Sequence, residues 1–122
     1  MQKRVLVLDD EPGILMSFKE MLQSETVLVD TAASVKSAEA LLSLNDYSAV
    51  ILDVRLGGSL REGGMKVLRF LKEQRPGTGA IVATGFGNPE SMQEAFVLGA
   101  AFYFQKPVSI NTLQNALRSL GV

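Results

Sequence analysis

The sequence predicts an α/β protein built on one parallel β-sheet, and three observations lead to this prediction. Short apolar runs rich in Val, Ile and Leu recur along the 122-residue chain. Between them lie longer stretches in which apolar residues return every three or four positions. The first pattern is typical of strands buried on both faces, and the second of helices with one buried side. No repeat, low-complexity tract or linker interrupts the alternation, so we expect one domain over residues 1–122.

Three strands and two helices are expected in the first half of the chain. The strands are the apolar runs at residues 5–8, 27–29 and 49–54. After Pro12 the apolar residues follow helical spacing, and the stripe consists of Ile14, Leu15, Phe18, Met21 and Leu22. Ser34 can accept a hydrogen bond from the first turn of a second helix and so cap it. The apolar face of this second helix consists of Val35, Ala38, Leu41 and Leu42.

The second half of the chain adds two strands and three helices. The strands are at residues 80–83 and 102–104. A Gly-rich loop leads into a helix that Pro76 and Gly77 end, with an apolar face of Val67, Leu68 and Leu71. Asn88 and Pro89 begin the next helix and Gly99 ends it, and its apolar members are Met92, Ala95 and Phe96. The last helix covers residues 109–120, with Ile110, Leu113, Ala116, Leu117 and Leu120 facing inward.

Strands that alternate with helices of this length pair in parallel through right-handed crossovers, which places helices on both faces of the sheet. The pattern does not fix the order of the five strands. For a sheet of this size the flavodoxin-like order 2-1-3-4-5 is the common choice, and it is the order that we predict. A run of basic residues on the third helix is interpreted as its solvated face, with a docking surface as the less favoured reading; its members are Arg61, Lys66, Arg69, Lys72 and Arg75.

The composition excludes several classes of function. A net charge of −1 and a pI of about 5.4 provide no basic field for nucleic acid or lipid, and no segment approaches the length of a membrane span. The chain contains neither cysteine nor histidine, so it has no disulfides, thiolate or imidazole metal ligands, or histidine base. We therefore expect a cytoplasmic protein without direct nucleic-acid or membrane binding, in which any metal is held by oxygen atoms.

Four of the predicted strands lead to polar residues that could handle a phosphoryl group. Asp9 and Asp10 follow the first strand, Asp53 ends the third, Thr84 follows the fourth and Lys106 comes just after the fifth. In a parallel sheet the carboxyl ends of the strands meet at one edge, and ligands bind there. Each residue alone has an ordinary explanation as a helix cap, a turn residue or a solvated side chain. Their occurrence together on four strands favours a functional site.

Three neighbouring carboxylates indicate a divalent cation. At about 4 Å and an effective dielectric constant of about 20, each like-charge pair costs on the order of 4 kcal/mol, which a bound cation would offset. A hard cation such as Mg²⁺ prefers oxygen ligands. Asp53 is in addition a possible nucleophile, because carboxylates form acyl phosphates. Thr84 and Lys106 are suited to bind phosphoryl oxygens through a hydroxyl and an ammonium group.

The chain resembles the two-component response-regulator receiver domains of the CheY-like superfamily over essentially its whole length. The resemblance is carried, in this order and spacing, by VLVLDDEP at residues 5–12, ILDV at 51–54, VATG at 82–85 and GAAFYFQKP at 99–107. It implies a phosphorylated switch rather than an enzyme with a separate substrate, a protein that catalyses only its own phosphorylation and dephosphorylation. Asp53 would be the phospho-acceptor. Asp10 and Asp53 would bind Mg²⁺ or Mn²⁺ together with the Arg55 backbone carbonyl, and Asp9 would contribute through a water molecule.

The resemblance also implies roles around the phosphoryl group itself. Thr84 and Lys106 would bind its oxygens, and Tyr103 would be the switch aromatic. The peptide bond before Pro107 would be cis. Hydrolysis of the acyl phosphate would be tuned by the residues two positions beyond the phospho-acceptor and beyond the threonine, which are Arg55 and Phe86.

One segment departs from the family pattern. The family usually has a proline four residues after the phospho-acceptor, where this chain has Gly57, and the helix motif at residues 64–68 starts about three residues late. The loop over residues 56–63 is therefore expected to be enlarged and more mobile. Because it lies beside the site, it bears on partner recognition and on the lifetime of the phosphoryl group.

The implied partners are a sensor histidine kinase or a His-phosphotransfer domain as donor, and a downstream effector or attached output domain as receiver of the signal. The latter would use the face formed by the fourth helix, fifth strand and fifth helix. One alternative is a binding module that keeps the fold without phosphorylation. A haloacid-dehalogenase-like phosphatase is less favoured, because its motif needs a second aspartate where this chain has Glu11 or Pro12. A flavodoxin relative that binds flavin would need a phosphate-cradling loop, which the sequence lacks.

Overall fold

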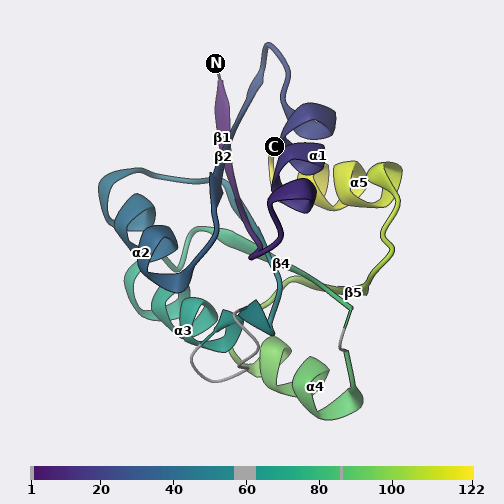
Figure 1. Ribbon diagram of the computed structural model, residues 1–122. Coiled ribbons are helices and arrows are strands. Elements are labelled where there is room, and N and C mark those ends of the chain that lie inside the picture. The colour runs from purple at the N-terminus through teal and green to yellow at the C-terminus, as the bar shows by residue number, and fades with distance from the viewer. Residues whose placement is uncertain (1, 57–62, 86) are drawn as a thin grey trace.

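The computed structural model describes residues 2–56, 63–85 and 87–122 (Figure 1). Its sheet has five strands, all paired in parallel, in the predicted order β2-β1-β3-β4-β5. The strands are β1 (Lys3–Leu8), β2 (Val27–Ala32), β3 (Ala49–Leu52), β4 (Gly79–Thr84) and β5 (Phe102–Gln105). The predicted fold class and strand order are confirmed.

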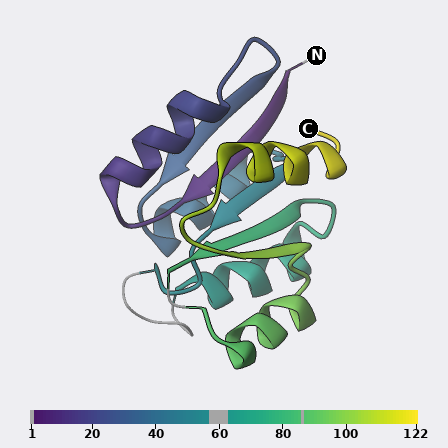
Figure 2. The ribbon, with the colours of Figure 1, turned by 90° about the vertical axis from the view of Figure 1, so that its right-hand side faces the viewer.

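Five helices connect the strands and cover both faces of the sheet. They are α1 (Pro12–Leu22), α2 (Val35–Leu44), α3 (Gly64–Gln74), α4 (Pro89–Val97) and α5 (Ile110–Ser119). Figures 1 and 2 show α1 and α5 on one face, and α2, α3 and α4 on the other. No helix in the described ranges is long and apolar enough to cross a membrane.

The sheet contributes to two hydrophobic clusters, one on each face, because successive strand residues point in opposite directions. On β1, Leu6 and Leu8 pack toward α2, α3 and α4. Val5 and Val7 pack toward α1 and α5. All four side chains are at most 1% exposed, which explains why the strand reads as a continuous apolar run.

The elements differ from the predicted ones mainly at their ends. β2 continues to Ala32 rather than ending at residue 29, because an edge strand tolerates polar residues such as Asp30 and Thr31 on its partly open faces. β3 ends at Leu52, so that Asp53 already lies in the turn that follows. Within the predicted stripe of α1, Met21 is 48% exposed, and on α4 Phe96 is 46% exposed.

Two helices begin with the same kind of cap. Ser34 and Ser37 form a capping box at the start of α2, and Asn88 and Ser91 form one at the start of α4. In each box the side chain of the first residue accepts from the backbone N–H three residues on, and the second side chain accepts from the backbone N–H of the first. After α4, Gly99 has a φ of 99°, the left-handed conformation that ends many helices.

The basic residues of α3 do more than face solvent, so the predicted solvated face is only partly correct. Arg75 donates from Nε to the Leu42 carbonyl at 2.9 Å and from Nη2 to the Ser43 carbonyl at 3.3 Å, in the last turn of α2. Lys72 donates from Nζ to the Val97 carbonyl at the end of α4, at 3.2 Å. Both cations thus lie at the negative end of a neighbouring helix, where they satisfy carbonyls that lack helical partners. Lys66 is exposed as predicted.

Candidate functional site

The predicted polar residues lie where the strands of the sheet end. Asp9 follows β1, Asp53 follows β3, Thr84 is the last residue of β4 and Lys106 follows β5. The strand order places β3 between β1 and β4, so segments far apart in sequence become neighbours. Asp9 is 3% exposed, Asp53 7% and Thr84 0%, although polar side chains are rarely so buried. Asp10, in contrast, is exposed.

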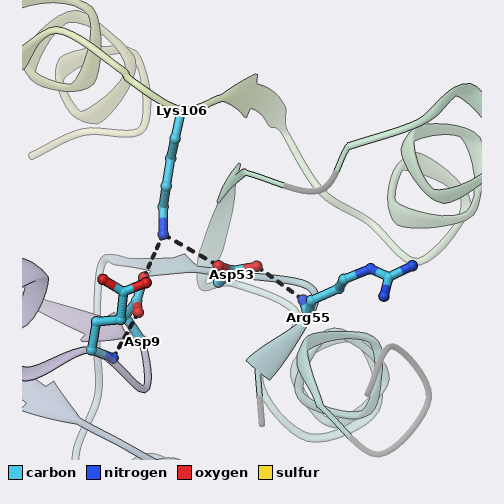
Figure 3. A network of polar contacts seen from close by, with 5 residues as sticks. Asp9, Asp53, Arg55 and Lys106 are labelled. Carbon is cyan, nitrogen blue, oxygen red and sulfur yellow. Dashed lines mark hydrogen bonds and ion pairs between the residues drawn. The ribbon is translucent and has the colours of Figure 1, made fainter. Parts of the chain in front are cut away.

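Lys106 joins two of the buried carboxylates (Figure 3). Its Nζ lies 2.6 Å from Asp9 Oδ2 and 3.2 Å from Asp53 Oδ2. The other oxygen of each carboxylate accepts a backbone hydrogen bond, from Glu11 N to Asp9 Oδ1 at 3.0 Å and from Arg55 N to Asp53 Oδ1 at 2.9 Å. Both carboxylates are therefore held from two sides, which fixes their orientation as well as their position.

The backbone around Lys106 directs its side chain into the site. Lys106 N donates to the Thr84 carbonyl at 2.9 Å, and the Lys106–Pro107 peptide bond is cis. Burial by itself lowers the pKa of Lys106, but the hydrogen bonds and charges of Asp9 and Asp53 outweigh it, so that the pKa is raised. The ammonium group is consequently charged at neutral pH. The Lys106 charge offsets part of the repulsion between the Asp9 and Asp53 carboxylates. From the sequence, we expect a divalent cation to offset this repulsion.

The chemistry of the oxygen donors fits a hard cation such as Mg²⁺. The Asp53 carboxylate, the exposed Asp10 carboxylate and the Arg55 backbone carbonyl would supply the ligands, and each Asp53 oxygen has a lone pair beyond the contact it already makes. Within residues 2–56, 63–85 and 87–122, no three acidic side chains come together as a ready-made metal cage. The expected group of three neighbouring carboxylates is thus not found in this part of the chain, and a Mg²⁺ site would rest on one or two carboxylates, as is common for this ion.

Gly64 is a residue of the site that sequence reasoning missed. A Cβ at this position would lie 2.4 Å from the Asp53 carbonyl oxygen and 2.4 Å from the Val54 Cα. The backbone of α3 can therefore approach the segment after β3 only because residue 64 has no side chain. Gly64 N also donates to the Val54 carbonyl at 3.1 Å. The start of α3 thus supports the backbone that carries Asp53.

Tyr103 lies on β5, half-buried between the sheet and α4. Its hydroxyl is 2.7 Å from Ser91 Oγ, and its ring contacts the Phe96 ring with centroids 6.4 Å apart. A Cβ at Gly87 would lie 3.0 Å from the Tyr103 hydroxyl and 3.5 Å from the Thr84 Cγ2 methyl. Ser91 and Gly87 are further residues that the sequence did not single out. A sequence signal for Ser91 does exist, because Asn88 and Pro89 begin a helix and a serine at its third position is typical of a capping box.

The structure gives less information on the other residues that were predicted for the site. The Arg55 side chain runs away from the Asp53 carboxylate, and only its backbone N–H contacts it in Figure 3. Phe86 and most of the enlarged loop, residues 57–62, lie outside the described residues. Their predicted roles in hydrolysis and recognition therefore stay predictions.

Fold and site together define a flavodoxin-like α/β protein with two buried aspartates and a lysine at the carboxyl edge of its sheet. Comparison with known proteins identifies the family within this fold class. The family described as Response regulator receiver domain matches residues 5–118. The chain therefore belongs to the response-regulator receiver domains of two-component signalling, a family of signalling switches. The resemblance inferred from the sequence motifs is confirmed.

Individual relatives agree with this assignment. The alginate biosynthesis transcriptional regulatory protein AlgB of Pseudomonas aeruginosa is 35% identical over 115 residues, which cover 94% of this chain and 25% of AlgB. The chain thus spans about a quarter of the length of that relative. Among solved structures, a CheY-like receiver domain protein from Methanospirillum hungatei has a TM-score of 0.88 at 27% identity, covering 99% and 98% of the two chains. The beryllofluoride-activated NtrC4 receiver domain dimer has a TM-score of 0.87 at 30% identity, covering 98% and 96%.

Proposed function

We propose that this receiver domain accepts a phosphoryl group on Asp53 from a phosphohistidine of a sensor kinase or His-phosphotransfer domain, in a Mg²⁺-dependent reaction. The observation that carries the proposal is the Asp53 carboxylate itself. It is buried at a strand end, with Lys106 Nζ 3.2 Å from one oxygen and Arg55 N 2.9 Å from the other. These contacts support Asp53 as a carboxylate nucleophile at the edge where ligands bind in folds of this kind.

The transfer needs little from the protein beyond position and charge. An Asp53 oxygen forms a bond to phosphorus while the bond from phosphorus to the donor imidazole nitrogen breaks, and the electron pair stays on that imidazole. No general base is required, because the nucleophile is a carboxylate, and the lack of histidine is therefore no obstacle. When bound, Mg²⁺ would neutralise charge on the transferring group.

In the proposed reaction, Lys106 exchanges one partner for another. Its contact with Asp9 is 2.6 Å and that with Asp53 is 3.2 Å, so the shorter contact can hold the ammonium while the longer one is replaced. Phosphorylation consumes the Asp53 charge but adds about −1.5 to −2 on the phosphoryl oxygens. Lys106 therefore leaves the Asp53 carboxylate oxygen for the phosphoryl oxygens, which carry more negative charge. The buried Thr84 hydroxyl is proposed as the second phosphoryl contact.

These two contacts are strong enough to operate a switch. Moving a two-state equilibrium from 1:99 to 99:1 takes about 5.5 kcal/mol of differential binding. Hydrogen bonds to charged groups contribute about 1.5–3 kcal/mol each, so Lys106 and Thr84 can supply most of that amount. The proposal includes a cytoplasmic location and an effector or output domain that reads the face of α4, β5 and α5. Exposed Met92 and Phe96 on α4 support the choice of this face.

Incubation with Mg²⁺ and acetyl phosphate, followed by intact mass measurement, tests the proposed chemistry. We expect one phosphoryl adduct in the parent protein and none in Asp53→Asn. Asp46→Asn is the matched control, because Asp46 has a side chain 96% exposed and should leave the adduct unchanged. An unmodified parent would instead favour the phosphorylation-independent binding module. Continuous release of phosphate from an ester substrate would favour the phosphatase.

Mg²⁺ binding by Asp10 can be tested separately through thermal stability. A ligand that binds only the folded protein raises its stability, by about 2.7 kcal/mol at one hundred times the dissociation constant. We expect added Mg²⁺ to raise the melting temperature of the parent and to have much less effect on Asp10→Asn. The measurement is thermal unfolding followed by circular dichroism, with Asp46→Asn as control. Equal responses of parent and Asp10→Asn would show that Asp10 is not a ligand.

A further inference from the structure

The hydroxyl groups of Tyr103 and Ser91 form a contact that links β5 to α4. Their oxygens are 2.7 Å apart, and Ser91 is 3% exposed. The Ser91 hydroxyl also donates to the Asn88 carbonyl at 3.1 Å. Because a serine hydroxyl has only one proton, Tyr103 is the donor to Ser91 Oγ whenever Ser91 donates to Asn88.

The Ser91 side chain thus takes part both in the cap of α4 and in the contact with Tyr103. It closes the capping box of α4, in which Asn88 N donates to Ser91 Oγ at 3.3 Å and Ser91 N donates to Asn88 Oδ1 at 2.8 Å. The same hydroxyl also forms the contact with the Tyr103 hydroxyl. The capping box at α2 has the same arrangement of Ser34 and Ser37, and there the hydroxyl of the second serine contacts the side chain and the carbonyl of Ser34 instead of a tyrosine. Helix capping alone therefore does not require the tyrosine contact.

The space around the Tyr103 hydroxyl is shaped for it. A Cβ at Gly87 would lie 3.0 Å from this hydroxyl and 3.3 Å from the Tyr103 Cε1, so an alanine there would crowd the ring. The same point is 3.5 Å from the Thr84 methyl. The Tyr103 hydroxyl and the Thr84 methyl group thus both lie close to Gly87. The position of the Tyr103 ring therefore bears on the space that is open to the Thr84 side chain.

We propose that Ser91 is a positioning residue that holds Tyr103 against the first turn of α4, and that this latch supports the arrangement of Thr84 that binds a phosphoryl group. The second part rests on the function proposed above. The latch ties the ring to the backbone of α4, so that the position of the ring and that of the helix start change together. Because coupling between two sites is reciprocal, weakening the latch weakens binding at Asp53.

Fluorine spectroscopy tests the first part of the proposal without phosphorylation. The chain has two tyrosines, so fluorotyrosine labelling gives two resonances, and Tyr103→Phe assigns them. Ser91→Ala should shift the Tyr103 resonance and increase its solvent isotope effect, with Tyr47 as the internal reference. Ser37→Ala breaks the matching capping box of α2 and should move neither resonance. A Tyr103 resonance identical in Ser91→Ala and the parent would overturn the latch.

Titration with beryllofluoride and Mg²⁺, a mimic of the phosphoryl group, tests the second part. One hydrogen bond corresponds to a change in affinity on the order of fivefold, and we expect Ser91→Ala and Tyr103→Phe each to weaken binding by about that factor. The double variant should be no weaker than either single one, because both remove the same contact. Unchanged affinity in Ser91→Ala would overturn the coupling. A parent that binds no mimic would contradict the proposed function, and the fluorine spectra would still decide the latch.

Discussion

At the scale of single residues, Lys106 determines the electrostatics of the site. It lies between Asp9 and Asp53, and its side chain is 20% exposed. The sequence predicts that these residues converge, because each follows a parallel strand and the carboxyl ends of such strands share an edge. It does not predict that the ammonium bridges both carboxylates, since side-chain contacts depend on the geometry of the folded chain.

Replacing Lys106 should therefore destabilise the protein. Lys106→Met leaves two buried carboxylates without their cation, and breaking a buried ion pair in this way costs on the order of 3 kcal/mol. Urea unfolding measures this free energy. Lys19→Met on the exposed side of α1 is the control and should change stability by less than about 0.5 kcal/mol. Equal stability of the two variants would contradict the bridging role.

The raised pKa of Lys106 predicts how that cost depends on pH. A group whose pKa is higher in the folded than in the unfolded chain contributes its full stability below the unfolded pKa, and loses it as the pH rises through the folded value. The ordinary lysine pKa is 10.5. The stability difference between parent and Lys106→Met should thus be constant between about pH 7 and 9 and shrink only above about pH 10.5. A decline already at neutral pH would contradict the direction of the shift.

Glycines at two positions should respond to alanine with opposite signs. At Gly64 a Cβ would lie 2.4 Å from the backbone of Asp53 and Val54, and overpacking of this kind costs about 1–3 kcal/mol. Phosphorylation by acetyl phosphate should also slow, because the backbone that carries Asp53 must move. At Gly13, on α1, nothing lies within 4 Å, and alanine should stabilise by about 0.4–1 kcal/mol. Urea unfolding of both variants measures the two signs.

At the scale of elements, α3 acts as a link between its two neighbours. Arg75 binds carbonyls at the end of α2, Lys72 binds one at the end of α4, and Arg69 Nη1 lies 4.0 Å from Glu94 Oε1 on α4. The sequence shows the spacing of these basic residues, but it does not show which groups their side chains bind. They are backbone carbonyls of other helices, and a sequence pattern contains no information on which helix end will be near.

Arg75 should contribute more to stability than its charge alone suggests. Arg75→Met removes two hydrogen bonds to helix-end carbonyls, and we expect a loss of about 1–2 kcal/mol in the free energy of unfolding. The ion pair with Asp46 at 3.3 Å adds little, because the Asp46 side chain is exposed. Lys66→Met, on the exposed side of the same helix, should be nearly neutral. If Asp46→Asn cost as much as Arg75→Met, the ion pair and not the carbonyl contacts would be responsible.

The elements themselves were largely predictable because local patterns and the fold agree. Ser34 caps α2 and Gly99 follows α4 in a left-handed conformation, as the sequence predicts. The errors lie where burial is partial. Polar Asp30 belongs to an edge strand, and Met21 has the spacing of a buried residue but remains exposed. Apolar spacing indicates which side of a helix turns inward, but it does not show how far the neighbouring elements cover that side.

At the scale of the whole molecule, one sheet supports two hydrophobic clusters. Neighbouring residues on β1 and β3 belong to opposite clusters, as Leu6 and Val7 illustrate. Unfolding of either cluster would disrupt the strands that also contribute side chains to the other cluster. Local propensity did not determine the strand order, which instead agrees with the common order for five parallel strands.

This shared sheet predicts cooperative unfolding of residues 1–122 as one domain. Urea transitions followed by circular dichroism and by tyrosine fluorescence should coincide. Leu6→Ala in one cluster and Val7→Ala in the other should each move both transitions together, by an amount that reflects a core truncation of about 1–4 kcal/mol. Separate transitions for the two probes, or a variant that moves only one of them, would show that the two faces unfold independently.

The contact between Val54 and Gly64 has a consequence for protein engineering. The Gly64 N–H to Val54 carbonyl bond, at 3.1 Å, joins the two ends of the intervening stretch. The entropy of closing a flexible loop rises only with the logarithm of its length, by about 0.6 kcal/mol for each doubling. A peptide epitope or recognition sequence grafted after Leu56, which leaves the Arg55 contact with Asp53 in place, would therefore enter at modest thermodynamic cost. The Val54–Gly64 hydrogen bond would hold the two ends of the graft together beside β3, which makes this junction an entry point for redirecting the choice of partner.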